Sequence, residues 1–130
     1  MSKIFGGGSV PDFALPSDSD LTETPSGLKI QTIDEGSGKQ PGPTDQVEVH
    51  YAGWLLSGKL FDSSYGRGQT ITFGLNQVIP GWTEGLQHMK EGGKSKLVIP
   101  ADLAYGSRGA PPAIGPNETL LFQVELIQVK

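Results

Sequence analysis

Residues 28–130 contain several short stretches in which apolar and polar residues alternate. The clearest one starts at residue 46, where Val47, Val49 and Tyr51 are separated by polar residues, and it can continue to residue 56. A period of two is typical of a β-strand, because successive side chains point to opposite faces. This pattern, or a short apolar run bounded by turn residues, also predicts strands over residues 28–33, 71–73, 96–99 and 119–129.

One short helix is predicted between Gly81 and Met89. Trp82, Leu86 and Met89 are spaced so that they share one face of a helix. Pro80 is tolerated at the start of this helix, and two glycines soon after Met89 end it. The many strands and the single helix predict an α+β fold in which an antiparallel sheet packs on one helix.

Glycine and proline are frequent, with 19 glycines and 10 prolines among 130 residues. This is about twice their combined share in an average chain. Such a composition favours short strands joined by turns over a helical bundle. Hydrophobic residues make up 35% of the chain and charged residues 18%, which suits one packed core in a single domain.

Residues 1–26 differ from the rest because they show no sustained hydrophobic period and contain a Gly-Gly-Gly-Ser run. We interpret them as a flexible arm before a domain at residues 27–130. A cloning remnant or a truncated leader is one alternative, and docking of Val10, Phe13 and Leu15 on a neighbouring surface is another. The first residues lack the apolar segment of an intact signal peptide. A cytoplasmic location is therefore predicted, with a processed periplasmic or otherwise exported form as the alternative.

The formal net charge is −4 and the isoelectric point is about 5.0. Without a surplus of positive charge, we expect no nucleic-acid partner, because contacts with phosphates supply most non-specific affinity. No apolar run approaches the roughly 20 residues that a membrane span needs, so no membrane partner is expected.

Most catalytic motifs are absent from the sequence. It contains no cysteine, which excludes disulfides, thiol catalysis and zinc–thiolate sites. His50 and His88 lie on different predicted elements without further metal ligands nearby, so we predict no metal site, and we expect His50 to be exposed. The sequence has neither a phosphate loop nor a nucleophile elbow, and no cofactor is predicted.

The aromatic residues are the most informative set, because eight of the ten follow residue 45. Core packing explains any one of them taken alone. However, Tyr51, Tyr65, Tyr105 and Trp82 carry polar groups that need partners when buried, and several adjoin glycine-rich loops, where sites often form. The eight are Tyr51, Trp54, Phe61, Tyr65, Phe73, Trp82, Tyr105 and Phe122.

Five blocks of sequence resemble those of FKBP-type peptidyl-prolyl isomerases in their order and approximate spacing. Each block alone is weakly specific, but all five occur in register over roughly residues 26–130. The blocks are residues 50–55 (HYAGWL), 58–64 (GKLFDSS), 78–86 (VIPGWTEGL), 99–106 (IPADLAYG) and 120–126 (LLFQVEL).

The resemblance implies a half-barrel, in which a curved antiparallel sheet of five to six strands wraps around one short α-helix. It also implies a peptidyl-prolyl cis-trans isomerase that accelerates rotation about Xaa–Pro bonds and assists protein folding without a cofactor. A chaperone or partner-binding module that binds proline or hydrophobic peptides with little turnover is the alternative. The expected partners are proline-containing segments of other proteins and macrolides such as tacrolimus or rapamycin. The chain is expected to be a monomer.

The resemblance further implies an apolar pocket between helix and sheet, with Trp82 as its floor. The implied catalytic residues are Asp62, Tyr105, Tyr51, Phe61 and Trp82, and the implied substrate- or macrolide-binding residues are Phe73, Val78, Ile79, Ala110, Ile114 and Phe122. Whether Ile71 or Phe73 lines the pocket is left open. For Asp62, the resemblance implies that it helps to orient the substrate carbonyl, whereas its local sequence is also typical of an Asx turn.

Overall fold

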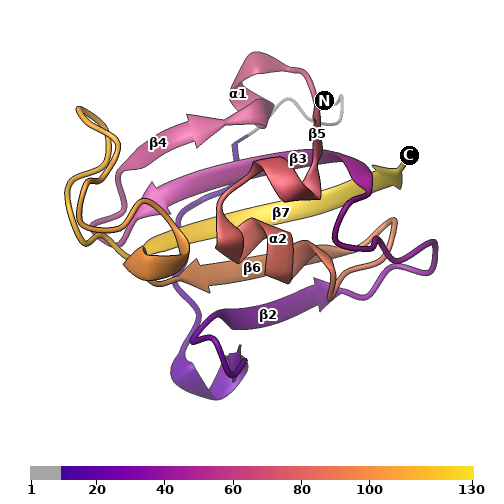
Figure 1. Ribbon diagram of the computed structural model, residues 1–130, viewed down its shortest axis with the longest axis horizontal. Coiled ribbons are helices and arrows are strands. Elements are labelled where there is room, and N and C mark those ends of the chain that lie inside the picture. Colours follow the sequence, from indigo (N-terminus) through magenta and orange to yellow (C-terminus); the bar gives the residue numbers. More distant parts are fainter. Residues whose placement is uncertain (1–9) are drawn as a thin grey trace.

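The structure is a computed structural model, and it describes residues 10–130. An open antiparallel sheet of seven strands curves around one main helix, α2 (Figure 1). The strands are β1 (Thr22–Glu23), β2 (Lys29–Asp34), β3 (Gln46–Leu55), β4 (Leu60–Ser63), β5 (Ile71–Gly74), β6 (Lys94–Ile99) and β7 (Leu120–Val129). The helices are α1 (Ser64–Arg67) and α2 (Pro80–Leu86), and three short 3₁₀ turns are η1 (Asp18–Asp20), η2 (Leu75–Gln77) and η3 (Ala101–Leu103). The predicted α+β fold is confirmed, with seven strands instead of five to six.

The two longest strands, β3 and β7, form the centre of the sheet. They pair in antiparallel fashion from Val47 opposite Val129 to Leu55 opposite Leu120. The order across the sheet is β1-β2-β6-β7-β3-β4. β5 pairs with the first half of β3, and β4 pairs with its second half. The outer edge of β3 therefore carries two short strands that can diverge from each other.

The main core lies between α2 and the concave face of the sheet. Val47 and Val49, predicted to alternate inward, are fully buried there, together with Leu86 of α2. The helix lies close to β6, because a Cβ atom on Gly81 would be only 2.5 Å from Cγ2 of Ile99. Close approach of the helix backbone therefore requires glycine at this position.

The predicted helix ends earlier than expected, at Leu86 instead of Met89. The next three residues continue as a tighter turn, in which Gln87, His88 and Met89 donate to the carbonyl three residues earlier. Such bonds are common where an α-helix ends. This tighter turn still leaves Met89 buried, with 3% of its surface exposed, as its place in the helical pattern predicted.

The convex face of the sheet carries a second apolar cluster. Trp54, Tyr65 and Leu121 are buried in it, and Val10 and Phe13 pack against it. Docking of these two N-terminal residues matches one of the alternatives left open by the sequence, whereas Leu15 is 49% exposed. Residues 1–9 of the expected arm lie outside the described residues. The predicted cytoplasmic location depends on these first residues, so it stays a prediction. The mobility of the arm and the domain boundary stay predictions.

His50 is half-buried, and the prediction that it is simply exposed is wrong. Its Nδ1 atom lies 2.8 Å from Oγ of Ser64, and its ring stacks on Tyr65 with centroids 4.6 Å apart. The reason is α1, which the sequence pattern did not predict and which folds against this part of β3.

Residues 10–130 lack two kinds of feature. None of the helices in this part of the chain combines the length and apolar character needed to cross a membrane. The same residues contain no group of three or more His, Asp or Glu side chains placed to share a metal ion.

Candidate active site

A cavity of about 500 Å³ opens between the concave face of the sheet and the start of α2. Most of its wall is apolar, with a smaller number of polar groups. Its lining residues are Tyr51, Phe61, Asp62, Ile71, Phe73, Gln77, Val78, Ile79, Trp82, Tyr105 and Phe122. The structure thus brings together every predicted site residue except Ala110 and Ile114, while the chemical role of each one stays a prediction.

Trp82 of α2 lines the cavity and is only 6% exposed. The rings of Tyr51 and Phe122 meet it edge to face, with centroids 5.1 Å and 5.2 Å away, and Phe73 lies 5.3 Å away. Such arrangements are favourable for aromatic pairs. The buried Nε1 of Trp82 has no hydrogen-bond acceptor among residues 10–130. The indole therefore offers an apolar surface and one unpaired N–H.

A β-bulge in β4 turns two neighbouring side chains toward the cavity. Asp62 pairs with Gly53 of β3. The next pair joins Leu60 to Trp54, which leaves Phe61 as an extra residue in β4. In a regular strand, Phe61 and Asp62 would point to opposite faces, whereas both line the cavity here. The bulge thus places an apolar wall and a carboxylate side by side.

Gly53 makes room for the aromatic wall. A Cβ atom at this position would lie 2.6 Å from Cε1 of Phe122 and 2.7 Å from Cζ of Phe61. These two rings meet edge to face, with centroids 5.5 Å apart. The absence of a side chain on Gly53 therefore allows them to close the cavity above β3.

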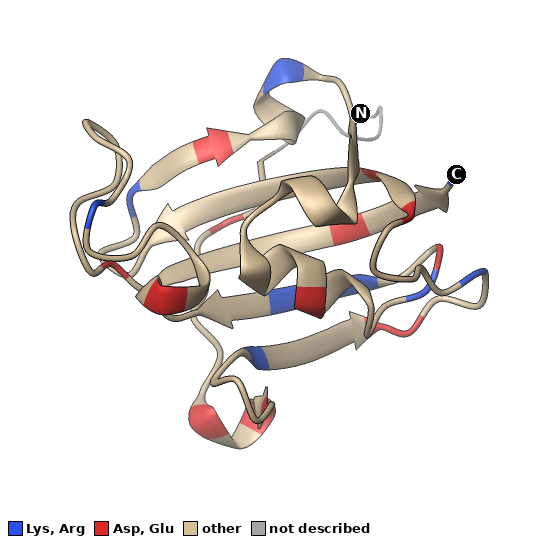
Figure 2. Ribbon diagram, viewed as in Figure 1, with Lys and Arg blue, Asp and Glu red and all other residues tan. Residues whose placement is uncertain are grey.

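The polar rim is a network of three side chains. Asp62 accepts a hydrogen bond from the Tyr51 hydroxyl at 2.5 Å through Oδ2 and pairs with Nη1 of Arg67 at 2.7 Å through Oδ1. Nη2 of Arg67 donates to the Tyr51 hydroxyl at 3.1 Å, and its guanidinium lies 5.7 Å from the centroid of the Tyr51 ring. Figure 2 shows the acidic position of β4 and the basic position of α1 on these neighbouring elements. Each oxygen of Asp62 therefore has its own donor.

Arg67 was not among the predicted site residues, because α1 was not predicted. This helix has only four residues, which is too short for a helical period. The sequence marks its two ends only by a serine before it and a glycine after it. Ser63 Oγ accepts a hydrogen bond from Gly66 N at 3.2 Å. Gly68 has a φ of 68°, in the left-handed region that favours glycine. Ser63 thus caps the turn. The side chain of Asp62 faces Tyr51 and Arg67, which corrects the alternative that made Asp62 the turn cap.

The network controls the charge of the rim. Burial acts to raise the pKa of Asp62, but hydrogen bonds from Tyr51 and Arg67 outweigh it, so this pKa lies below its usual value. Burial, followed by the hydrogen bond to Asp62, raises the pKa of Tyr51. At neutral pH the carboxyl group is therefore ionised and the Tyr51 hydroxyl keeps its proton.

Tyr105, which follows η3, also lines the cavity and is 39% exposed. Burial, followed by the charge of Asp62, raises the pKa of Tyr105. Among residues 10–130, no hydrogen-bond partner is assigned to its hydroxyl or to the backbone N–H of Ile79. Both residues line the cavity, and residues 10–130 leave these two donors without an acceptor.

Ile71 and Phe73 both line the cavity, so the choice between them does not arise. They stand two apart in β5, and residues i and i+2 of a strand share a face. Gln77 also lines the cavity and was missed. It lies in η2, where no hydrophobic period marks the residues that face inward.

Ala110 and Ile114 are not among the residues that line the cavity, and the expectation that they bind substrate or macrolide stays a prediction. They pair with each other: Ala110 N donates to Ile114 O at 2.9 Å, and Ile114 N donates to Ala110 O at 3.1 Å. This pairing closes the tip of their loop on itself. Ile114 is then only 4% exposed and packs in the main core.

Comparison with known proteins identifies the family. Residues 37–127 match the family model described as FKBP-type peptidyl-prolyl cis-trans isomerase, and the chain belongs to this family. The FKBP-type peptidyl-prolyl cis-trans isomerase FkpA of Escherichia coli K12 is 54% identical over 105 residues, which are 81% of this chain and 38% of that protein. The family predicted from the five sequence blocks is confirmed.

Two further matches differ in how much of the matched protein the chain covers. The FK506-binding protein of Neisseria meningitidis serogroup B is 51% identical over 105 residues, 79% of this chain and 96% of that protein. The crystal structure of FkpA from Escherichia coli superposes with a TM-score of 0.83 at 50% identity, covering 87% of this chain and 53% of that one. The chain therefore spans well under half of the FkpA sequence but nearly all of the Neisseria relative.

Proposed function

We propose that the cavity binds the proline of an Xaa–Pro segment and accelerates rotation about the peptide bond before it. The observation that supports this most directly is the aromatic cavity, enclosed by Trp82, Phe61 and Phe122 and bordered by an ionised carboxylate. Rotation about an Xaa–Pro bond breaks amide resonance, with a barrier of about 18–20 kcal/mol. It takes tens to hundreds of seconds without a catalyst. Rotation makes and breaks no covalent bond, so the reaction needs no nucleophile and no metal.

The aromatic walls supply a difference in solvation. A planar amide is strongly polarised, with negative charge on oxygen and positive charge on nitrogen, and rotation reduces this charge separation. Water stabilises the planar form more than the twisted form, so a dry cavity favours the twisted form relative to solution. A ten-thousandfold acceleration requires about 5.5 kcal/mol of such stabilisation. Release from water and a fixed turn in the bound chain are the two sources that we propose.

The polar groups orient the bound segment. The Tyr51 hydroxyl is occupied by Asp62, so it holds the carboxylate in place. The Tyr105 hydroxyl and the Ile79 N–H are the groups that we propose as donors to carbonyl oxygens of the substrate. Hydrogen bonds that strengthen as the amide twists contribute to the rate, whereas those made equally in both states contribute only to binding.

Proline-containing segments of other proteins are the proposed substrates, and assistance of protein folding is the proposed role. One relative is named FK506-binding protein, and we propose that macrolides such as tacrolimus and rapamycin occupy the same cavity. We further propose that the chain acts as a monomer, because both apolar faces of the sheet are covered by its own residues.

A protease-coupled or NMR exchange assay on an Xaa–Pro peptide tests the proposal. Catalytic amounts of the chain should raise the cis–trans exchange rate, and excess rapamycin should return it to the rate in buffer. Peptide binding without acceleration would instead establish a binding module with little turnover. If the peptide saturates the chain and the cis–trans exchange rate still equals that in buffer, the isomerase proposal is refuted.

A further inference from the structure

The N-terminal segment crosses the convex face of the sheet, opposite α2. Phe13 meets Trp54 edge to face, with ring centroids 6.0 Å apart at 66°, and the carbonyl of Ala14 accepts from Nζ of Lys96 on β6 at 2.7 Å. The segment then adds β1 to the edge of β2 and reaches α2, where Ser26 Oγ donates to a Glu84 carboxylate oxygen at 2.5 Å. Figure 1 shows this indigo part of the chain passing behind the sheet. We call residues 10–26 the strap.

The strap covers the residue that stands opposite the bulge of β4. Trp54 is the β3 residue at which the pairing shifts, since its partner is Leu60 while Gly53 pairs with Asp62. Its side chain lies on the convex face, where it is 3% exposed and in contact with Phe13. A bulge disrupts the ladder of hydrogen bonds locally. Where ladder hydrogen bonds are lost, side-chain packing on the convex face contributes more to holding β4 in register with β3.

The strap also contacts both ends of the segment that carries the rim. A Cβ atom on Gly58, in the turn before β4, would lie 3.5 Å from Cδ2 of Phe13. A Cβ atom on Gly66, in α1, would lie 3.8 Å from Cγ2 of Val10. Between these two points lie Phe61 and Asp62, and the residue after Gly66 is Arg67. The strap therefore lies against both ends of the segment that carries Phe61, Asp62 and Arg67.

We propose that the strap is a positioning element for the reaction, with Phe13 as its principal residue: by packing on Trp54 it holds the β4 bulge in the register that directs Phe61 and Asp62 into the cavity. This inference rests on the proposed isomerase function for its catalytic consequence, but the effect on β4 geometry does not. A displacement of about 1 Å in a positioned group can lower a rate by as much as about a hundredfold. Because β3 and α1 still restrain β4, we expect Phe13→Ala to lower kcat/KM by about 5- to 20-fold.

Leu15→Ala is the matched control. Leu15 belongs to the same strap and is also a large apolar residue, but it is 49% exposed and lies outside the cluster around Trp54. The full chain, Phe13→Ala, Leu15→Ala and the conservative variant Phe13→Leu are compared by kcat/KM on one Xaa–Pro peptide and by amide chemical shifts. All rates are measured at a temperature at which urea titrations show each variant to be more than 99% folded.

The proposal expects a lower kcat/KM in Phe13→Ala, partial recovery in Phe13→Leu, and no change in Leu15→Ala. It also expects amide shift changes at residues 60–67, across the sheet from the mutation. A kcat/KM equal to that of the unchanged chain, or a loss of the same size in Leu15→Ala, would overturn it. If Phe13→Ala does not fold, Val10→Ala takes its place with the same expectations for residues 60–67.

The amide shifts keep this inference separate from the proposed function. If the unchanged chain does not isomerise the peptide, the isomerase proposal fails while the strap is still tested by the shifts at residues 60–67. If the unchanged chain is active and Phe13→Ala leaves both rate and shifts unaltered, the strap proposal fails alone.

Discussion

Replacing Tyr51 by Phe removes one oxygen atom from the rim of the cavity and leaves the ring in place. In the unchanged protein this hydroxyl donates to Asp62 at 2.5 Å and accepts from Arg67 at 3.1 Å. Because Tyr51 is 6% exposed and its ring packs on Trp82, the loss concerns the hydrogen bonds far more than packing. The variant therefore measures the value of the rim network.

The expected magnitude follows from the exposure of the partner. Hydrogen bonds to charged groups contribute about 1.5–3 kcal/mol to stability. The Asp62 side chain is 43% exposed, so water can replace the lost donor. We therefore expect a loss of about 1 kcal/mol in the free energy of unfolding. If the same amount is lost from the transition state, kcat/KM falls about fivefold.

The pKa of Asp62 reports most directly on the loss of its hydrogen bond from Tyr51. Burial raises this pKa and the hydrogen bonds lower it below its usual value of 3.8, so Tyr51→Phe should raise it. A lowered pKa in the folded state contributes stability at neutral pH that is lost as the pH falls through that pKa. The difference in unfolding free energy between the two proteins should thus be largest near pH 7 and should shrink below about pH 4.

Tyr65→Phe is the matched control for this experiment. The Tyr65 hydroxyl donates to Glu125 Oε1 at 3.1 Å, and the side chain belongs to the cluster on the convex face. NMR titration of the Asp62 carboxyl carbon, urea denaturation and the isomerase assay are applied to both variants. An unchanged Asp62 pKa in Tyr51→Phe, or an equal fall of kcat/KM in Tyr65→Phe, would refute the reasoning.

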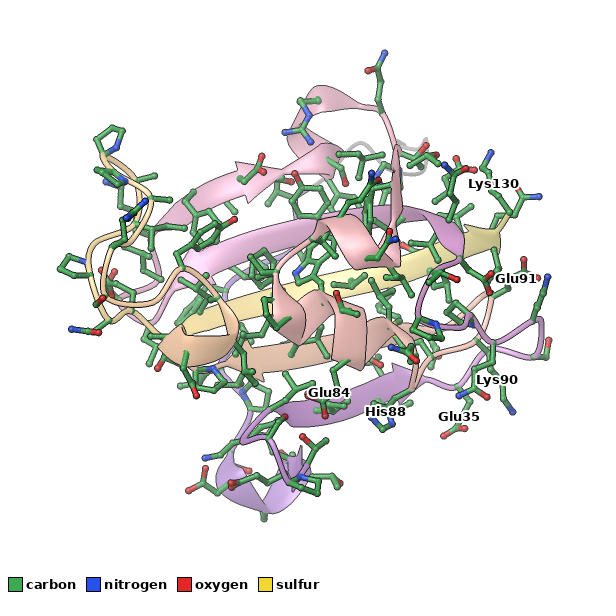
Figure 3. All side chains as sticks on the ribbon, in the orientation of Figure 1. Glu35, Glu84, His88, Lys90, Glu91 and Lys130 are labelled. Carbon is green, nitrogen blue, oxygen red and sulfur yellow. The ribbon has the colours of Figure 1, made fainter. Side chains whose placement is uncertain are left out.

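Three further changes test other parts of the structure. Gly53→Ala should displace the ring of Phe122, cost about 1–3 kcal/mol in unfolding free energy and lower rapamycin affinity; an unaltered affinity by calorimetry would contradict the close approach. Trp82→Ala should lower the free energy of unfolding by about 3–5 kcal/mol, and an unchanged urea midpoint would show that Trp82 is not part of the core. Glu91 accepts from the backbone N–H of Val129 at 2.7 Å, close to the end of β7 (Figure 3). This bond, followed by one from a second backbone N–H, lowers the pKa of Glu91 below its usual 4.5. Stability that depends on ionised Glu91 should be lost as the pH falls below 4.5, and Glu91→Gln should flatten this pH profile in urea titrations; an equally steep profile would contradict it.

Regular alternation accounts for the parts of the fold that the sequence predicted well. In β3, the predicted inward positions Val47 and Val49 are fully buried, because one face of the strand packs on α2. The helix was found for the same reason, since Trp82 and Leu86 share its buried face. A periodic pattern records only which face of an element is buried, so it placed Trp82 on the inner face of its helix, whereas its place in a cavity was implied by the resemblance alone.

The parts that were missed depend on contacts between distant segments. β4 was not predicted because its bulge breaks the alternation at Phe61, and Arg67 was missed because α1 is too short to show a period. The pairing of Ala110 with Ile114 was missed as well, because a loop that closes on itself leaves no signal in the hydrophobic pattern.

The most direct test of the account is NMR exchange spectroscopy on a peptide with a ¹³C-labelled proline, recorded with substoichiometric amounts of the chain. The account predicts cis–trans exchange that is faster than in buffer, together with nuclear Overhauser effects from the proline ring to the indole protons of Trp82. Exchange at the rate found in buffer, or faster exchange with proline contacts away from Trp82, would contradict it.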